Sequence, residues 1–573
     1  MIICGIKASH DGAVAVIEDG RLRFSVEMEK IANGARHSPL GDLRRISEIL
    51  AREGLSAGDV DQFVVDGWYT SGRDGSRAVT LDNGGLPVEL AVAPYLESPG
   101  DEGPLQRHRF ESRAFGYVSF THVANHLLGG YCASPFAAAG EDALVLVWDG
   151  GTVPRLYRVR AATREVTLVS ALLPVTGNSF ADFCSQFGPY VADTSGLTAD
   201  EVIRHHLSIA GKAMAYSGLG RAEPEVFALF DEVTAALPHA GRTEPNPVLL
   251  SEEMTGAVAG ADFDRARNLG AKLAANRDQL VPGLSDADLI ASYQEYLGQR
   301  LLDRLTTVVE RGFPGQRPNL VLSGGCALNI KWNTLIRASG LFRAVFAPPF
   351  PNDAGAAIGT AACESFHRGN LALDWDVYSG PALVAGPVPD GWRAQPCDER
   401  QLARLLHTEG EPVVVLSGRA ELGPRALGNR SILAPATDPG MKARLNAAKN
   451  RADYRPVAPV CLAARAPEVF TPGTPDPYML FEHRLRPGWA ERVPAVVHLD
   501  GTARLQTIDG HAHSATARIL AAYEQLSGVP VLCNTSANFE GSGFFPDVAS
   551  AARWGGTRHI WSEGTLYTSA TAP

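Results

Sequence analysis

Two histidines, His122 and His126, stand four residues apart in the segment SFTHVANHLLGG (119–130). On a helix, residues i and i+4 lie on the same face, so both imidazoles could reach one cation. Two core or solvated histidines without a ligand are the simpler interpretation of an isolated HxxxH pair. The zinc-protease motif is excluded, because it needs a glutamate after the first histidine and this chain has Val123. A metal site therefore depends on ligands elsewhere in the chain.

Two aspartates are the candidates for those ligands. Asp149 ends an apolar strand, and Asp353 stands in a PND loop before a helix of small residues. With the histidines they would offer two nitrogens and two carboxylate oxygens. That set suits iron, manganese or zinc better than magnesium, which prefers oxygen and water. The alternative for Asp353, and the one favoured when it is taken alone, is an N-cap of the following helix.

A run of basic residues between Gly418 and Pro456 is the strongest local signal in the second half of the chain. This segment contains eight basic and three acidic residues, although the whole chain carries a net charge of -11. Arginine forks bind phosphate bidentately, so several that converge would hold a multiply charged anion. A solvated basic face is the alternative, and RNA is disfavoured because no aromatic platform is interleaved. The eight residues are Arg419, Arg425, Arg430, Lys442, Arg444, Lys449, Arg451 and Arg455.

Three glycine-containing turns follow apolar strands in the first part of the chain. Glycine lets backbone N–H groups point into one concavity, which favours phosphate, although most such glycines serve only the turn. The order of the turns is the layout of the actin-like ATPase fold, in which two related halves close on a nucleotide. The turns are Asp11-Gly12, Asp149-Gly150-Gly151 and Ser323-Gly324-Gly325.

The elements that would position these residues alternate between strands and helices. Most of 201–310 has helical periodicity, and a helix is predicted at 441–450. A stretch rich in proline and glycine, 371–395, predicts a linker. We therefore expect an α/β protein with one domain over 1–370 and a second over 396–573. Strands are predicted within 1–6, 13–20, 21–29, 143–160, 319–329, 412–418 and 529–541, and those in 319–329 and 529–541 run into a glycine turn and a polar loop.

The composition is typical of a large globular protein. The chain has 573 residues, 45% of them hydrophobic, and eight scattered cysteines without a CxxC pair, which indicates reduced thiols. Neither a signal peptide nor an apolar run of membrane-spanning length is found. We expect a soluble cytoplasmic protein with no membrane or nucleic-acid partner.

Short segments along nearly the whole chain are similar to those of one family. They include HVANHLLGGYCASPF, SGGCALN, NDAGAAIG, KNRADYRPVAP and, most specific, GPRALGNRSIL. With them the chain resembles the ATP-dependent O-carbamoyltransferases of natural-product biosynthesis, whose members include nodulation-factor and cephem carbamoyltransferases and the aminoglycoside enzyme nebramycin 5′ synthase.

The resemblance implies two linked reactions in two domains. A C-terminal YrdC-like domain would convert carbamoyl phosphate and ATP, with Mg²⁺, to carbamoyl-adenylate and pyrophosphate. An N-terminal actin-like (ASKHA fold) domain would pass the carbamoyl group to a hydroxyl of a small metabolite. A divalent iron ion there, or manganese or zinc, would hold the adenylate phosphate. A homodimer is left open.

The resemblance also implies roles for individual residues. His10 would be the base that takes the proton of the acceptor hydroxyl, because histidine titrates near neutrality. The alternative is that His10 only hydrogen-bonds the nucleotide phosphate or caps its turn. The metal ligands would be His122, His126, Asp149 and Asp353. The nucleotide in the N-terminal domain would contact Asp11, Gly150, Gly151, Lys212, Gly324, Gly325 and Asn329. Carbamoyl phosphate and ATP in the C-terminal domain would contact Arg419, Arg425, Arg430, Lys449, Arg451, Arg455, Asn534 and Ser536.

The chain departs from the family pattern at a few positions. Gly12 replaces a small polar residue, Ala452 replaces a glutamate beside Asp453, and the usual NTSFN is NTSAN. Because Lys449 and Arg455 are kept, these changes concern the acceptor pocket more than the adenylation site. Three other functions remain open: a tRNA threonylcarbamoyl-type modification enzyme, an actin-fold kinase or ATPase, and a non-catalytic regulator. Pyrophosphate release that requires carbamoyl phosphate and no tRNA would separate them.

Overall fold

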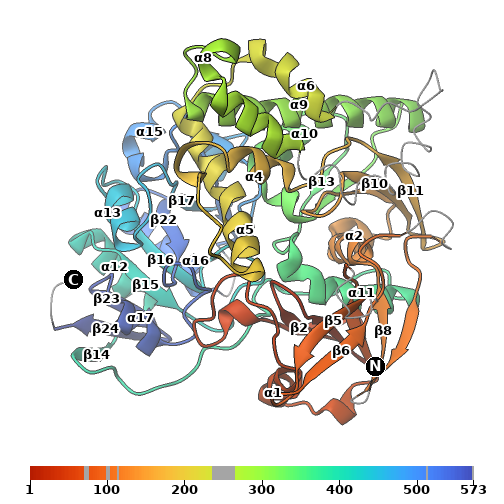
Figure 1. Ribbon diagram of the computed structural model, residues 1–573. Coiled ribbons are helices and arrows are strands. Elements are labelled where there is room, and N and C mark those ends of the chain that lie inside the picture. The colour runs from red at the N-terminus through yellow and green to blue at the C-terminus, as the bar shows by residue number, and fades with distance from the viewer. Residues whose placement is uncertain (70–76, 98–102, 113–114, 235–264, 511–513, 571–573) are drawn as a thin grey trace. The chain divides into compact units, whose positions relative to one another are not determined.

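The computed structural model describes residues 1–69, 77–97, 103–112, 115–234, 265–510 and 514–570 (Figure 1). The protein is mixed α/β, as the sequence predicted, and it divides into two compact units. Unit 1 contains residues 1–9, 14–23 and 40–375, and unit 2 contains residues 10–13, 24–39 and 376–573. Unit 2 therefore includes two short pieces of the N-terminal sequence. The domain limits expected at 370 and 396 stay a prediction.

The first sheet of unit 1 begins with the predicted N-terminal hairpin. Its three strands are confirmed, and the sheet continues through parallel pairing of β1 with β4 and of β4 with β8. Buried apolar side chains such as Ile6, Val14 and Val64 give the sheet its core. The six strands, in sheet order, are β3 (Arg21–Glu27), β2 (Ala13–Glu18), β1 (Ile2–Lys7), β4 (Gln62–Asp66), β8 (Gly116–Phe120) and β7 (His108–Glu111).

The second sheet of unit 1 is built around the two strands that end in the glycine turns. Strand β9 pairs in parallel with β12, so the turns after both strands meet at one edge of the sheet. The strand with a glycine turn expected over 143–160 is in fact two strands on either side of that turn, and the buried strand expected within 319–329 is confirmed. In sheet order the strands are β11 (Glu165–Ala171), β10 (Arg155–Arg160), β9 (Ala143–Val147), β12 (Leu320–Ser323) and β13 (Val345–Phe346).

Two buried helices, α2 (His122–Cys132) and α11 (Ala356–His367), pack side by side in unit 1 (Figure 1). Their close approach requires small residues. A Cβ at Gly359 would lie 2.2 Å from the carbonyl oxygen of Asn125, so only glycine fits that position. Helix α11 is thus the predicted small-residue helix, and it also contacts β1.

The predicted helical region of unit 1 is confirmed for the residues that the structure describes, and residues 235–264 lie outside them. Helix α9 begins with a capping box in which Ser285 and Asp288 bond reciprocally. The helices of this part are α5 (Ala199–Tyr216), α6 (Phe227–Thr234), α8 (Arg277–Leu280), α9 (Asp286–Gly312) and, after β12, α10 (Ile330–Ala338).

Unit 2 is an eight-stranded mixed sheet with its own apolar core, in which Trp561, Leu532 and Val414 are buried. Helices α12 (Glu399–Glu409) and α16 (Ala515–Ser527) pack together, and α13 (Met441–Ala448) is the helix predicted at 441–450. The strands predicted at 412–418 and within 529–541 are also confirmed. In sheet order the strands are β14 (Trp392–Pro396), β24 (Thr565–Ser569), β23 (His559–Ser562), β15 (Val413–Leu416), β16 (Arg430–Pro435), β22 (Val531–Ser536), β17 (Ala458–Leu462) and β21 (Gln506–Ile508).

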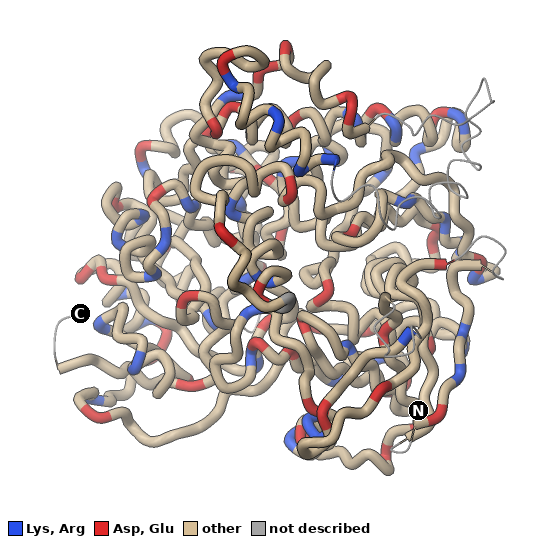
Figure 2. Tube along the Cα trace, in the orientation of Figure 1, with Lys and Arg blue, Asp and Glu red and all other residues tan. Residues whose placement is uncertain are grey.

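The charges of the chain are mixed rather than segregated. Acidic and basic residues are interspersed along the trace in both units (Figure 2). Among the helices of the described residues, none is long and apolar enough to cross a membrane.

Candidate functional site

The two histidines of the HxxxH pair occupy the first turns of helix α2. Strand β8 ends two residues earlier, and Thr121 caps the helix by accepting the N–H of Ala124 at 3.2 Å. Both histidines are buried, with 0% of His122 and 3% of His126 exposed, so they are not surface residues. The sequence prediction that they share one helix face is confirmed.

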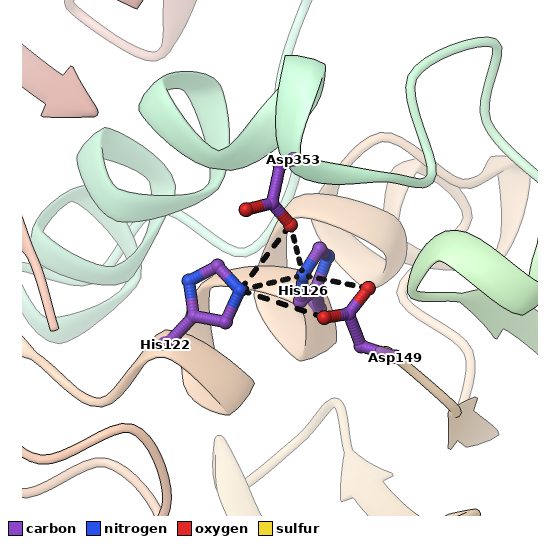
Figure 3. Close-up of side chains that lie close together, drawn as sticks. All are labelled: His122, His126, Asp149 and Asp353. Atoms are coloured by element: carbon purple, nitrogen blue, oxygen red, sulfur yellow. Dashed lines mark hydrogen bonds and ion pairs between the residues drawn. The ribbon is translucent and has the colours of Figure 1, made fainter. Parts of the chain in front are cut away.

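The structure brings these histidines together with Asp149 and Asp353 in one buried cluster of unit 1 (Figure 3). The Nε2 atoms of the two histidines lie 3.1 Å apart. Asp353 Oδ1 lies 3.3 Å from His122 Nε2 and 3.2 Å from His126 Nε2. The carboxylate of Asp149 is 3.8 Å and 3.7 Å from the same two nitrogens. One ligand atom from each residue lies within 4.8 Å of all the others.

Each histidine is oriented through its other ring nitrogen. His122 Nδ1 lies 2.8 Å from Asp66 Oδ2, and His126 Nδ1 lies 3.1 Å from the carbonyl oxygen of Pro351. A carboxylate and a carbonyl can only accept, so both Nδ1 atoms carry the proton and donate it. Both Nε2 atoms then present lone pairs to the centre of the cluster. Ligand histidines in metal sites are usually held in this way.

This cluster fits a divalent metal ion. Two imidazole lone pairs and an oxygen of Asp353 converge without a hydrogen between them, which is unfavourable unless a cation lies there. Two nitrogens and two oxygens favour a transition metal or zinc over magnesium. Burial and Lys7 would lower the pKa of His122, but Asp66 and Asp353 raise it well above its ordinary value. The surroundings therefore favour positive charge, which a metal ion would supply while both imidazoles stay neutral.

The N-cap interpretation of Asp353 is wrong. Gly355 is the N-cap residue of α11, and the Asp353 carboxylate faces the two histidines instead. Its other oxygen, Oδ2, lies 2.8 Å from Nζ of Lys7. The sequence does not mark Lys7 and Asp66 as site residues, because a lysine and an aspartate at the ends of apolar strands belong to no motif.

Asp149 is held from two sides. The hydroxyl of Tyr95 donates to Asp149 Oδ2 at 2.6 Å, and the backbone N–H of Gly325 donates to Oδ1 at 2.7 Å. The second bond joins the glycine turns after β9 and β12, which the parallel pairing of those strands brings together. The ring of Tyr95 also stacks on Tyr69, with centroids 4.2 Å apart.

The residues expected to contact a nucleotide in the N-terminal domain are not all gathered at this cluster. Gly150 and Gly151 follow β9. A Cβ at Gly150 would approach the Asn178 side chain and one at Gly151 would overlap the Tyr69 ring, so these glycines also leave room for neighbouring side chains. Gly324 has φ 84°, and a Cβ on it would lie 2.4 Å from the carbonyl oxygen of Trp148. Asn329 caps α10 through Trp332 N–H. Lys212 lies on α5, where its Nζ donates to Ser208 at 3.2 Å.

Asp11 belongs to unit 2, where it lies between two histidines. His10 Nδ1 is 3.0 Å from Asp11 Oδ2, and His37 Nδ1 is 2.9 Å from Asp11 Oδ1. Asp11 and His37 both have positive φ, 54° and 60°. This conformation is energetically unfavourable for residues other than glycine. Burial alone would lower the pKa of His37, but Asp11 raises it above its ordinary value. His10 was predicted from the sequence, whereas His37 belongs to no motif and was not.

Unit 2 also gathers half of the predicted basic run into one place. We use "cation cluster" for Arg36, Arg425, Lys449, Arg451, Arg455 and Arg504. Burial and then neighbouring arginines lower the pKa of Arg425, Lys449 and Arg451. Within the described residues, no carboxylate forms an ion pair with these three side chains. Like charges brought together in a partly buried place without counter-ions destabilise the protein, and a bound anion would relieve their repulsion.

The other four basic residues of the run lie outside the cation cluster as it is defined here. Arg430 is 1% exposed and donates to the carbonyl oxygens of Ser417 and Asn429 at 2.7 and 2.8 Å. Arg444 pairs with Glu411 at the surface, at 2.6 Å. Arg419 and Lys442 are half-buried. Arg444 therefore fits the solvated-face alternative, and for the cation cluster the anion pocket stays a prediction.

Two predicted neutral residues lie on strand β22. Asn534 is buried and donates to Ala426 O at 3.1 Å and to Gln506 Oε1 at 2.7 Å. Ser536 contacts Lys449, whose Nζ lies 3.3 Å from the serine Oγ. Asn534 thus contacts the residue that follows Arg425, and Ser536 contacts Lys449, so both side chains lie next to members of the cation cluster.

Arg36 and Arg504 were missed because each stands alone in the sequence. Arg36 reaches the cation cluster because residues 24–39 belong to unit 2. That segment is fixed by Lys30, which is buried and donates to the carbonyl oxygens of Glu421 and Gly423 at 2.5 and 2.8 Å. Glu27 accepts from Lys30 at 2.6 Å and from Gly423 N–H at 3.0 Å.

Comparison with known families identifies the class of protein. The family model described as Carbamoyltransferase N-terminus matches residues 2–101 and 109–363, and Carbamoyltransferase C-terminus matches residues 403–560. The chain belongs to the carbamoyltransferase family, as the sequence motifs predicted, and is a transferase.

Two relatives match over almost their whole lengths. Nodulation protein U of Sinorhizobium fredii (strain NBRC 101917 / NGR234) is 45% identical over 585 residues, which cover 100% of both chains. The 3'-hydroxymethylcephem-O-carbamoyltransferase of Streptomyces clavuligerus is 32% identical, covering 98% of this chain and 97% of the relative. A solved structure, the activator of the 2-hydroxyisocaproyl-CoA dehydratase from Clostridium difficile with bound ADPNP, matches with 14% identity over 64% of this chain and 97% of its own. Its TM-score of 0.29 is too low to assign the fold.

Proposed function

We propose that this protein is an ATP-dependent O-carbamoyltransferase that modifies a hydroxyl group of a small natural product. The family supports carbamoyl transfer, and the printed name of one relative supports transfer to oxygen. The observation that carries the proposal is the cation cluster of unit 2. Arg425, Lys449 and Arg451 lie there among like charges, and no carboxylate of the described residues forms an ion pair with these three side chains, which suits phosphorylated substrates.

The first reaction would take place in unit 2. Carbamoyl phosphate gives up its phosphate to water, and the resulting carbamate attacks the α-phosphorus of ATP, releasing pyrophosphate and leaving carbamoyl-adenylate. Arg425, Arg451 and Arg455 would bind the phosphate groups, with Lys449 held toward them by Ser536 and Asn538. Arg419 and Asn534 would border the pocket, and Arg430 would hold its loop. Mg²⁺ would accompany ATP.

The second reaction would pass the carbamoyl group to the acceptor. The acceptor oxygen attacks the carbamoyl carbon, the bond to the AMP oxygen breaks, and the hydroxyl proton moves to His10. Asp11 would hold Nδ1–H of His10, so that Nε2 is the atom that accepts the proton. A divalent ion, iron or else manganese or zinc, bound by His122, His126, Asp149 and Asp353 would supply positive charge for the leaving phosphate.

The finer assignments belong to the same proposal. Unit 1 would have the actin-like ASKHA fold and unit 2 the YrdC-like fold. Gly150, Gly151, Lys212, Gly324, Gly325 and Asn329 would lie along the nucleotide in unit 1. The protein would work in the cytoplasm without nucleic acid, as a monomer or a homodimer.

Two measurements test the proposal. Pyrophosphate and phosphate release from ATP and carbamoyl phosphate should each require both substrates and no tRNA. Mass spectrometry of candidate alcohols should show the mass gain of one carbamoyl group. Pyrophosphate release that does not depend on carbamoyl phosphate, or that depends on tRNA, would contradict the proposal.

A further inference from the structure

Lys7 is a fully buried lysine behind the metal-binding candidates of unit 1. It ends strand β1, and its side chain is 0% exposed. Its Nζ lies 2.8 Å from Asp66 Oδ2, 2.8 Å from Asp353 Oδ2 and 3.8 Å from the centre of the Trp68 ring. A buried ammonium is strongly unfavourable unless carboxylates pair with it, and here two do.

The two oxygens of the Asp353 carboxylate have different partners. Oδ2 faces Lys7, and Oδ1 faces the two histidine nitrogens at 3.2 and 3.3 Å. Asp353 is thereby turned to present one oxygen to the centre of the cluster. On the other side, the Asp66 carboxylate contacts both Lys7 and His122. The ammonium of Lys7 therefore connects Asp353 to Asp66, which orients His122.

Lys7 also sets the charge of the cluster. Asp66, Asp149 and Asp353 contribute three negative charges, and the two histidines are neutral ligands because each donates its Nδ1 proton. The ammonium of Lys7 reduces the total from three negative charges to two. Two negative charges match a divalent ion, whereas three would match a trivalent one.

We propose that Lys7 is a positioning residue that holds Asp353 as a one-oxygen ligand and makes the cluster selective for divalent over trivalent cations. The inference rests on the proposed function of the four residues as metal ligands. At an effective dielectric constant of about 20, repulsion between the ammonium and the extra charge of a trivalent ion held by the other oxygen of Asp353 corresponds to roughly a hundredfold in relative affinity.

The test compares Mn²⁺ and Tb³⁺ binding to metal-free protein. Free Mn²⁺ is followed by electron paramagnetic resonance, and Tb³⁺ by luminescence sensitised through the nearby aromatic rings. Lys7→Met should shift the affinity ratio toward Tb³⁺ by about a hundredfold. Because the ratio is compared between variants, the intrinsic preferences of the two ions cancel. Lys7→Gln, which keeps a donor for Asp353 without the charge, should shift it in the same direction.

Two further variants separate charge from structure. Lys30→Met removes another buried, paired lysine, in unit 2, and should leave the ratio unchanged. The double variant Lys7→Met/Asp66→Asn returns the cluster to two negative charges and should restore the ratio to near that of the unaltered protein. A ratio within about threefold of the unaltered protein in both Lys7 variants would overturn the inference. If the unaltered protein bound neither ion, the metal assignment itself would fail, and the inference with it.

Discussion

Arg425 allows the anion site to be tested through stability as well as binding. Burial and the neighbouring Arg504, Arg36 and Arg455 lower its pKa well below the ordinary value. Its Nε is buried and has no hydrogen-bond partner among the described residues. Replacing it with methionine keeps the apolar stem and removes one of several mutually repelling charges. Arg425→Met should therefore stabilise the ligand-free protein by about 0.5–2 kcal/mol, as relief of strain at functional sites commonly does.

The same substitution should weaken anion binding. Pyrophosphate at a hundred times its Kd stabilises the unaltered protein by about 2.7 kcal/mol. At about 2–4 °C per kcal/mol, this raises Tm by about 5–11 °C. Loss of one charged hydrogen bond, worth about 1.5–3 kcal/mol, weakens binding roughly ten- to a hundredfold. At the same pyrophosphate concentration the rise in Tm should then fall to about 1–6 °C.

Thermal unfolding with and without pyrophosphate measures both effects. The matched control is Arg444→Met, because Arg444 belongs to the same basic run but pairs with Glu411 at the surface. It should change stability by no more than about 0.5 kcal/mol and keep the full pyrophosphate effect. The reasoning is refuted if Arg425→Met lowers the Tm of the ligand-free protein and retains the full rise with pyrophosphate.

Four other substitutions test the remaining parts of the site. Asp66→Asn should weaken metal binding about ten- to a hundredfold, measured as retained metal during dialysis, because His122 loses its charged partner; unchanged retention would contradict this. His126→Ala should lower metal content and carbamoyl transfer together but spare pyrophosphate release, and equal loss of both reactions would contradict the division of labour. Arg455→Ala should abolish pyrophosphate release while added carbamoyl-adenylate is still consumed; release at the normal rate would argue for a solvated face. His37→Asn keeps a residue that tolerates positive φ and should destabilise the protein by about 1.5–3 kcal/mol near pH 6 and by little near pH 9. The raised pKa of His37 makes its contribution complete below about pH 6.5, the unfolded value, and lost as pH rises through the folded value; an equal loss of Tm at both pH values would contradict it.

The secondary structure was largely predictable because the signals were local. Apolar segments that end in glycine turns form strands, and long amphipathic segments form helices, as expected. The candidate ligands His122 and His126 were equally local, since helical spacing alone places them on one face. Asp149 and Asp353 were predictable as candidates only because each followed a recognisable turn.

The residues that support the site could not be predicted, because they act over long distances in sequence. Asp66 and Lys7 contact the candidate ligands only once β1 and β4 have paired. Nothing in the sequence indicates that these two residues lie next to each other. Arg36 lies far from the basic run and joins it through the packing of residues 24–39 in unit 2. Asp353 contacts Lys7 with one carboxylate oxygen and the histidines with the other, and this arrangement likewise depends on tertiary structure rather than on the helix that follows Asp353.

The membership of residues 24–39 in unit 2 has a consequence for synthesis on the ribosome. This segment, with Lys30 and Arg36, packs with residues 376–573, which are made about 340 residues later. At about 5–20 residues per second, the segment waits roughly 17–70 seconds for its partner. During that interval the buried side chains of 24–39, including Phe24 and Val26, have no native partner from 376–573 and are candidates for chaperone binding. A fragment that begins at residue 376 would lack Arg36, His10 and Asp11 whatever its own stability.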